Sequence, residues 1–396
     1  MQQWQKTTPL IGLLVMLFFA TCSKDDEPQY NNTTTNTSTT SPTVIMPDST
    51  ATETGIIIDP LLLRPKLPPT PFNYADVSLL PNHFNSVYLN FLDNSPNNNP
   101  INDAGATLGR VLFYDTKLSI NNTIACASCH KQANAFSDPN QFSTGHNGEQ
   151  TNRNAMSLVN LRYGFRFFWD LSATSLEEQV LMPIENTIEM GMPLNELVPK
   201  LQSIDYYPPL FEAAFGSPTV STDGIAKALA QFLRSIMSYN AKYDEGITND
   251  FTNFTAQENL GRALFFNGQT GCNFCHTSEA FFSSQALNTG LESNYSDLGA
   301  GNGRFKAVTL RNIGLTAPYM HDGRFTTLEE VITQYNENIQ AHPFLDDRLT
   351  TNGQIGGPPK QLNLSAAEQA ALVAFLHTLT DYNLLETIKF SNPFVH

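Results

Sequence analysis

Cysteine is scarce in this sequence, with five residues among 396. Four of them stand in two short motifs, and the fifth, Cys22, lies near the N-terminus. No cysteine is left for a structural disulfide, which excludes the disulfide framework of a small secreted domain. Zinc is also a poor match, because no further Cys and no His-x-His stands near either pair to complete a tetrahedral site.

Positive charge is scarce as well. Lys and Arg number 22 against 37 Asp and Glu, which gives a formal net charge of −15. An acidic chain of this kind is repelled by nucleic acid, so we expect no nucleic-acid partner. The same charge would favour a basic redox partner.

Alternating apolar and polar patterns, which strands require, are rare in this chain. Beyond the N-terminal region, no run is long and apolar enough to cross a bilayer. We therefore expect a mainly α-helical fold with large loops.

The N-terminus has the pattern of a secretion signal. Lys6 precedes an eleven-residue apolar run at residues 10–20, which is too short to span a membrane as a helix. The following Ala20-Thr21-Cys22 resembles a bacterial lipobox, so we predict a lipoprotein signal peptide at residues 1–21 and a lipid on Cys22. The alternative is an ordinary signal peptide with an incidental cysteine. Either way the protein would be exported, to the periplasm or the cell surface, and would contact the membrane only through a lipid anchor.

Low-complexity sequence follows the signal. Every residue from 31 to 43 is Asn, Thr, Ser or Pro, and prolines continue beyond. Such a segment has little apolar surface to offset the entropy cost of ordering, so we predict a flexible tether at residues 22–75. The remaining chain, roughly 320 residues, is long enough for two domains of ordinary size. We predict these at residues 76–245 and 246–396.

Two Cys-x-x-Cys-His motifs carry the chemistry of the chain. They are Cys126-Ala127-Ser128-Cys129-His130 and Cys272-Asn273-Phe274-Cys275-His276. Two thiols three positions apart can reach both vinyl groups of one porphyrin, and the adjacent imidazole can then bind the iron. The sequence therefore predicts two covalently bound haem c groups, with His130 and His276 as proximal ligands.

The motifs lie inside a longer repeat. Leu108-Gly109-Arg110 precedes the first motif and Leu260-Gly261-Arg262 precedes the second. Downstream, residues 228–233 resemble residues 371–376, with apolar residues at helical spacing in both. Ser365 and Glu368 have the spacing of a capping box at the start of the last helix. This organisation predicts two tandem cytochrome c-like domains.

Further motifs give a family resemblance over roughly residues 100–385. They are Phe168-Trp169-Asp170, Leu310-Arg311-Asn312 and the stretch at residues 316–323. With the haem motifs, they make the chain similar to bacterial di-haem cytochrome c peroxidases and their MauG-type relatives. The resemblance implies that hydrogen peroxide reacts at the His130 haem and that the His276 haem transfers electrons.

The resemblance also assigns residues to the peroxide side. It implies that Gln179, Pro183 and Glu189 line the open face of the first haem, with Glu189 as the acid and base that moves a proton during O–O cleavage. Glu185 is the competing carboxylate, which we interpret as a surface or capping residue. Trp169 would lie between the haems as an electron relay; the alternative is a large apolar anchor of the core.

Iron ligands on the distal sides are less uniform in the family. His146, in a loop with Gly145 and Gly148, matches a histidine that in many of these peroxidases binds the first iron in the resting oxidised state. The alternative for His146 is a solvent-exposed loop residue. For the second iron, Tyr335 stands where peroxidases usually have Met, which is the MauG-type arrangement. Met320 is the alternative ligand.

One calcium ion between the haems is also implied by the resemblance. The ligands would be the Asn154 side chain and the backbone carbonyls of Thr316 and Pro318, which suit a hard cation. His321 would lie near the second haem. Arg311 could pair with a haem propionate or form a structural salt bridge.

Three functions follow from these assignments. The first is a di-haem peroxidase that draws electrons from a small cytochrome c or a cupredoxin. The second is a MauG-type enzyme that uses peroxide to oxidise a protein or organic substrate. The third, from another class, is a non-catalytic di-haem electron-transfer cytochrome.

Overall fold

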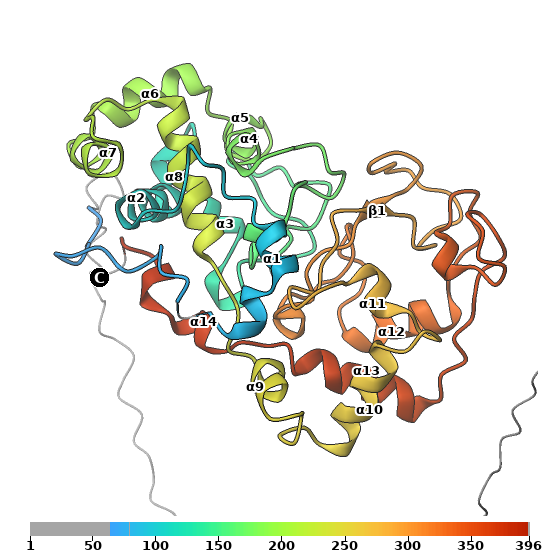
Figure 1. The fold of residues 1–396 in the computed structure, drawn as a ribbon. Coiled ribbons are helices and arrows are strands. Elements are labelled where there is room, and N and C mark those ends of the chain that lie inside the picture. The colour runs from blue at the N-terminus through green and yellow to red at the C-terminus, as the bar shows by residue number, and fades with distance from the viewer. Residues whose placement is uncertain (1–63, 79, 395–396) are drawn as a thin grey trace, which may run out of the picture. The chain divides into compact units, whose positions relative to one another are not determined.

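Helices make up most of the regular structure in the computed structural model, which describes residues 64–78 and 80–394 (Figure 1). In this described part, the strands are β1 (Ala286–Leu287) and β2 (Phe305–Lys306), which pair antiparallel with Leu287 opposite Phe305. The mainly α-helical fold with large loops is confirmed.

The helices divide along the chain into two similar series. The first series is α1 (Val87–Leu92), α2 (Asp103–Tyr114), α3 (Cys126–Cys129), α4 (Leu176–Gln179), α5 (Met182–Glu185), α6 (Leu194–Gln202), α7 (Tyr207–Phe215) and α8 (Thr222–Ser235). The second is α9 (Lys242–Thr248), α10 (Ala256–Phe265), α11 (Cys272–Cys275), α12 (Leu328–Glu337), α13 (Ala366–His377) and α14 (Asn383–Glu386). We call the parts with α2–α8 and α9–α13 the N-terminal and C-terminal halves.

One helix crossing is built twice. In the N-terminal half α2 packs on α8, and in the C-terminal half α10 packs on α13 (Figure 1). A Cβ atom at Gly109 would stand 2.0 Å from the carbonyl oxygen of Ala228, and one at Gly261 would stand 1.8 Å from that of Ala371. The repeated Leu-Gly-Arg motif therefore marks the point where the two backbones touch, which only glycine permits.

Side chains also fix where the helices begin. The Asn102 side chain accepts a hydrogen bond from the Gly105 amide at 2.7 Å, which caps α2. Before α13, Ser365 and Glu368 form the predicted capping box. These caps satisfy amide groups that a helix leaves without partners in its first turn.

Gly261→Ala should lower the free energy of unfolding by about 3 kcal/mol, because the added methyl group would force α10 and α13 apart. Gly268→Ala is the matched control, since a Cβ there meets open space. Denaturant unfolding followed by circular dichroism measures both. Equal midpoints for the two variants would contradict the close crossing.

The predicted domain boundary at residues 245 and 246 stays a prediction, and the cores of the structure bear on it in two places. The expected boundary between residues 245 and 246 falls inside α9, and Tyr243 of this helix is part of the C-terminal core. At the other end, Leu384, Phe390 and Phe394 belong to the N-terminal core rather than to the second domain. Each predicted domain therefore contributes a segment to the core of the other half.

The last part of the predicted tether contacts the folded chain. Tyr74 is buried, its hydroxyl donates to the Lys389 carbonyl at 2.6 Å, and its amide donates to Asp103 at 2.7 Å. Lys66 donates its amide to the carbonyl of Pro393 at 2.8 Å. Ordered structure therefore begins before residue 76.

The predicted signal peptide, the lipidation site Cys22 and tether residues 22–63 lie outside the described residues. Within the described part, no helix combines the length and the apolar character that crossing a membrane requires.

Candidate functional site

Each haem motif forms a one-turn helix, α3 or α11, that ends at its histidine. The His130 amide donates to the Cys126 carbonyl at 2.9 Å, and the His276 amide donates to that of Cys272 at 3.1 Å. All four motif cysteines are free of disulfides. Burial raises the pKa of Cys126 to about 12, so this thiol is neutral at physiological pH. Two free thiols on a single turn are what attachment to a porphyrin requires.

Both proximal histidines are oriented by a backbone carbonyl. His130 Nδ1 lies 3.0 Å from the Phe136 oxygen, and His276 Nδ1 lies 3.1 Å from the Val308 oxygen. A proton on Nδ1 leaves Nε2 as the nitrogen that can bind iron. Burial lowers the pKa of both rings, that of His276 to about 4, so both are neutral. His130 and His276 are therefore each suited to bind a haem iron through Nε2.

A cavity of about 210 Å³ lies beside the second motif. Cys272, His276 and Tyr335 line it, as does Met320. Tyr335 packs against the same apolar core as Cys272, whereas Met320 packs, like Trp169, against a smaller cluster centred on Phe305. Burial, and then the Cys275 and Cys272 thiols, raise the pKa of Tyr335 above its ordinary value. Both residues line the cavity, and the choice of Tyr335 over Met320 as the ligand of that iron stays a prediction.

The internal duplication adds a comparison that our sequence analysis missed. Helices α4 and α12 begin alike, because Ser175 and Thr327 cap them through Glu178 and Glu330. Counted from these caps, Pro183 occupies in the N-terminal half the position that Tyr335 occupies in the C-terminal half. An alignment of the two halves of the sequence is enough to show that Pro183 corresponds to Tyr335.

This pairing has a chemical consequence. A proline side chain has no atom that can bind iron, whereas a tyrosine has its phenolic oxygen. The same structural position therefore offers a ligand on the His276 side and none on the His130 side.

Glu189 lies on the His130 side. Its carboxylate is close enough to Cys126 and Cys129 to raise the pKa of both thiols, although burial of the thiols is the larger cause. Burial raises the pKa of Glu189 itself, and Asn186 Nδ2 donates to its Oε1 at 3.0 Å. Glu185 is exposed. The structure thus brings Glu189, and not Glu185, to the first haem motif.

Gln179 and Pro183 flank the turn that leads to this carboxylate. Gln179 ends α4, Pro183 stands in the first turn of α5, and both are half-buried. The Met190 amide donates to the Pro183 carbonyl at 3.3 Å, which ties the Glu189 segment back to α5. The arrangement is compatible with the predicted pocket.

His146 is attached to the same segment. Its amide donates to the Glu189 carbonyl at 2.9 Å, and its ring Nε2 lies 2.9 Å from the Thr187 carbonyl. A Cβ at Gly191 would stand 2.5 Å from that nitrogen, so glycine is needed to seat the ring. In this arrangement Nε2 is engaged by the backbone. Its binding to iron stays a prediction.

Trp169 lies where segments of the two halves meet. Its indole Nε1 donates to the Asn154 carbonyl at 2.8 Å, and its ring centroid is 6.4 Å from that of His321. His321 in turn stacks on Phe305, with centroids 3.5 Å apart. Trp169 also lines the cavity beside His276. Its position fits a relay between the halves, and the relay itself stays a prediction.

The predicted calcium ligands share that cavity. Asn154, Thr316 and Pro318 all line it. The Asn154 Nδ2 donates to the carbonyls of Asn140 and Gln141 at 3.1 and 3.2 Å, which leaves Oδ1 as the end of the amide available to a cation. Among the described residues, no cluster of three or more His, Cys, Asp or Glu side chains could hold a metal. Neutral oxygens are ligands that calcium accepts, so the residues fit the ion.

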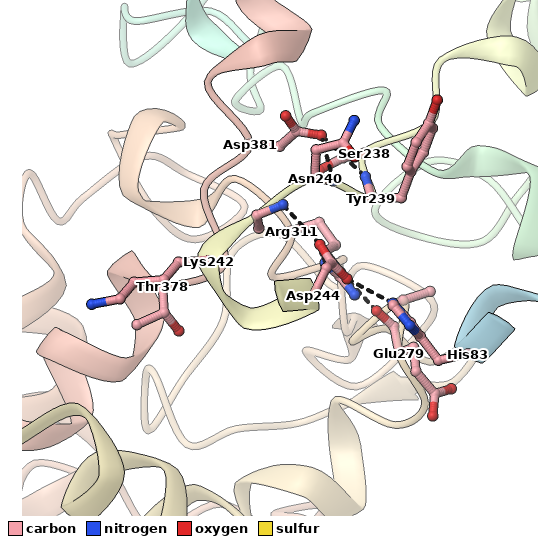
Figure 2. Close-up of polar contacts among 12 residues, drawn as sticks. His83, Ser238, Tyr239, Asn240, Lys242, Asp244, Glu279, Arg311, Thr378 and Asp381 are labelled. Atoms are coloured by element: carbon pink, nitrogen blue, oxygen red, sulfur yellow. Dashed lines mark hydrogen bonds and ion pairs between the residues drawn. The ribbon is translucent and has the colours of Figure 1, made fainter. Parts of the chain in front are cut away.

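Arg311 forms a buried salt bridge. Figure 2 shows the Asp244 carboxylate between the Arg311 guanidinium, at 2.7 and 2.9 Å, and the His83 ring, at 2.8 Å. Arg311 Nε also donates to the Glu279 carbonyl at 2.7 Å. Of our two alternatives for Arg311, the structure supports the structural salt bridge. His83 precedes α1 and Asp244 lies in α9, so the bridge joins the segment before α1 to the C-terminal half.

Comparison with known proteins identifies the family. A family model described as di-haem cytochrome c peroxidase matches residues 103–252 and 255–384. The methylamine utilization protein MauG of Methylorubrum extorquens is 33% identical over 295 residues, which cover 72% of this chain and 80% of that protein. The cytochrome c551 peroxidase of Nitrosomonas europaea is 33% identical over 296 residues, covering 71% and 81%.

Two solved structures have a similar fold. A MauG-like protein associated with microbial copper homeostasis is 33% identical, with a TM-score of 0.67 over 76% of this chain and 96% of that one. The diheme peroxidase BthA of Burkholderia thailandensis shares the fold, with a TM-score of 0.62 at 22% identity over 74% and 90%.

Proposed function

Because the chain belongs to the di-haem cytochrome c peroxidase family, an oxidoreductase family that acts on peroxide, we propose that it reduces hydrogen peroxide at the His130 site. The electrons would come from the His276 site past Trp169. The observation that carries this proposal is the difference between Pro183 and Tyr335 at one duplicated position. It gives the chain one iron site open to an external ligand and one with a ligand of its own.

Two covalently held haems would supply the iron centres for binding peroxide and storing electrons. The chain's part in O–O cleavage is proton transfer. Glu189, with its raised pKa, would take a proton from the near oxygen of peroxide and return it to the far one. Gln179 and Pro183 would shape the pocket around that oxygen.

The proposed function has two forms, which differ in the source of the electrons. A small cytochrome c or a cupredoxin would make this a cytochrome c peroxidase, and the chain's net charge of −15 suits a basic donor. Tyr335 favours the alternative, a MauG-type enzyme that oxidises a protein or organic substrate. An anionic phenolate ligand would hold the second iron at a low potential, whereas the usual Met raises it. A plain electron-transfer cytochrome would need neither Glu189 nor an open site.

Two further features complete the proposal. One calcium ion would bind at Asn154, Thr316 and Pro318, beside Trp169. The protein would be exported to the periplasm or the cell surface and held there by a lipid on Cys22.

Electron paramagnetic resonance of the purified ferric holoprotein tests the function. We expect one high-spin signal, from the His130 site, beside one low-spin signal from the His276 site. Two low-spin signals that persist after half-reduction would reject the peroxidase and leave the electron carrier.

Replacing His146 with Gly distinguishes the gated cytochrome c peroxidase from the MauG-type enzyme. If His146 binds the first iron at rest, wild type should need half-reduction before it turns over peroxide, and the variant should not. The measurement is peroxide consumption with and without one equivalent of reductant, with Asn147→Gly as the control in the same loop. Full activity of oxidised wild type would instead favour the MauG-type cycle.

A further inference from the structure

The two halves also resemble each other in sequence where they contact, over a longer stretch than the haem motifs. Residues 154–183 align with residues 306–335 without a gap. Asn160 and Asn312 correspond, and both adopt the left-handed conformation, with φ of 59° and 60°. The bridge between Phe167 and Ala173 likewise recurs between Tyr319 and Phe325. In this alignment Trp169 corresponds to His321, and Asn154 corresponds to Lys306.

The two segments contact each other reciprocally. The Asn154 amide donates to the His321 carbonyl at 2.7 Å, and the Lys306 amide donates to the Trp169 carbonyl at 2.9 Å. Each bond is the counterpart of the other under the alignment. Such an exchange is the pattern of an isologous, twofold interface, formed here within one chain.

The approximate twofold relation predicts a second cation position. The calcium position proposed above joins the Asn154 side chain to the carbonyls of Thr316 and Pro318. Its counterpart would join the Lys306 side chain to two other carbonyls, those of Gly164 and Arg166.

Lys306 fills that counterpart. Its Nζ donates to the Arg166 carbonyl at 2.8 Å, and the Gly164 carbonyl accepts a hydrogen bond from Asn94 Nδ2. The Arg166 carbonyl, which corresponds to that of the proposed calcium ligand Pro318, therefore accepts a hydrogen bond from the Lys306 ammonium group.

The surroundings of Lys306 are those of a buried cation without an acid. The residue is 7% exposed, and its Nζ lies 5.3 Å from the centre of the Phe167 ring. Among the described residues, no carboxylate comes within ion-pair distance of it. Burial lowers its pKa to about 8, so the ammonium form still predominates at neutral pH. Backbone oxygen and a ring face, the groups that stabilise bare cations, take the place of an anion.

We propose that the Lys306 ammonium is a tethered cation that occupies the twofold counterpart of the calcium position. The chain would then bind one exchangeable ion where a symmetric duplicate would bind two. This inference rests on the calcium site of the proposed function. Lys306 would act as a positioning residue, holding the backbone before Trp169 as calcium would hold the backbone before His321.

Three variants of the full holoprotein test the inference. Lys306→Asn copies the Asn154 arrangement, Asn154→Lys copies the Lys306 arrangement, and Lys306→Met removes the ammonium without adding an oxygen ligand. The measurements are bound calcium by atomic emission after dialysis, and Tm with calcium or with a chelator. We expect about one calcium for wild type and for Lys306→Met, about two for Lys306→Asn, and none for Asn154→Lys. Only Asn154→Lys should have a Tm that the chelator leaves unchanged.

Equal calcium in Lys306→Asn and Lys306→Met would overturn the inference. Failure of the calcium proposal itself would differ, because wild type would then bind none. A single ion gained by Lys306→Asn alone would in that case still support the role of Lys306. If Asn154→Lys fails to fold, the comparison of the two Lys306 variants decides.

Discussion

Replacing Glu189 with Gln should lower the rate of peroxide turnover by about 10²–10⁴-fold, the usual contribution of a positioned acid or base. The amide keeps the size of the side chain and its bond to Asn186, but it cannot take the proton from the near oxygen of peroxide and return it to the far one. Steady-state peroxide consumption, with haem content measured by absorbance, gives the result.

Glu185→Gln is the matched control for this experiment. Glu185 stands four residues earlier, is exposed, and should be replaceable without effect. A Glu189→Gln variant that keeps its haems and stays within about threefold of wild type would remove Glu189 from the proton transfer, since such a loss is below the ordinary range.

Asp244→Asn should lower the free energy of unfolding by about 3–5 kcal/mol, because it leaves the Arg311 guanidinium buried without its counter-charge. Arg311 is fully buried, and one of its terminal nitrogens already lacks a hydrogen-bond partner among the described residues. Denaturant unfolding of the holoprotein at neutral pH measures the loss.

The matched control is Asp223→Asn. Asp223 pairs with Lys227 on the surface of α8, where an ion pair contributes about 0.5 kcal/mol. Comparable losses for the two variants would contradict the role of the buried bridge.

The pH dependence of the Asp244 effect follows from its pKa. Burial alone would raise the pKa of Asp244, but the charge of Arg311 and the bond from His83 outweigh burial and hold it below the ordinary 3.8. A carboxyl with a lowered folded pKa stabilises the fold above its unfolded pKa and loses that contribution as pH falls through the folded value. The difference between wild type and Asp244→Asn should therefore be constant near neutrality and shrink only below about pH 3.8.

Local patterns in the sequence predicted the parts of the fold that depend on local chemistry. The haem motifs and the paired Leu-Gly-Arg motifs predicted the duplication of the chain. The helix crossing at Gly109 and Gly261, where contact between two backbones admits glycine alone, became apparent only in the structure. The capping box at Ser365 was likewise visible, since its partners are three residues apart.

Contacts between distant segments were the part that could not be predicted. The partner of Arg311 is Asp244, and nothing local to either residue indicates the other. The packing of α9 could not be predicted for the same reason, because Tyr243 packs with a core built from residues far later in the chain. The correspondence of Pro183 with Tyr335 differs, since it was present in the repeat and needed only a full alignment of the two halves.

The return of the C-terminal segment to the N-terminal core sets an order of assembly. Leu384, Phe390 and Phe394 complete a core that otherwise consists of residues made much earlier. A chain that grows from its N-terminus must therefore reach residues 384–394 before that core can close. The apolar core against which Cys126 packs is therefore incomplete until residues 384–394 have been added to the chain.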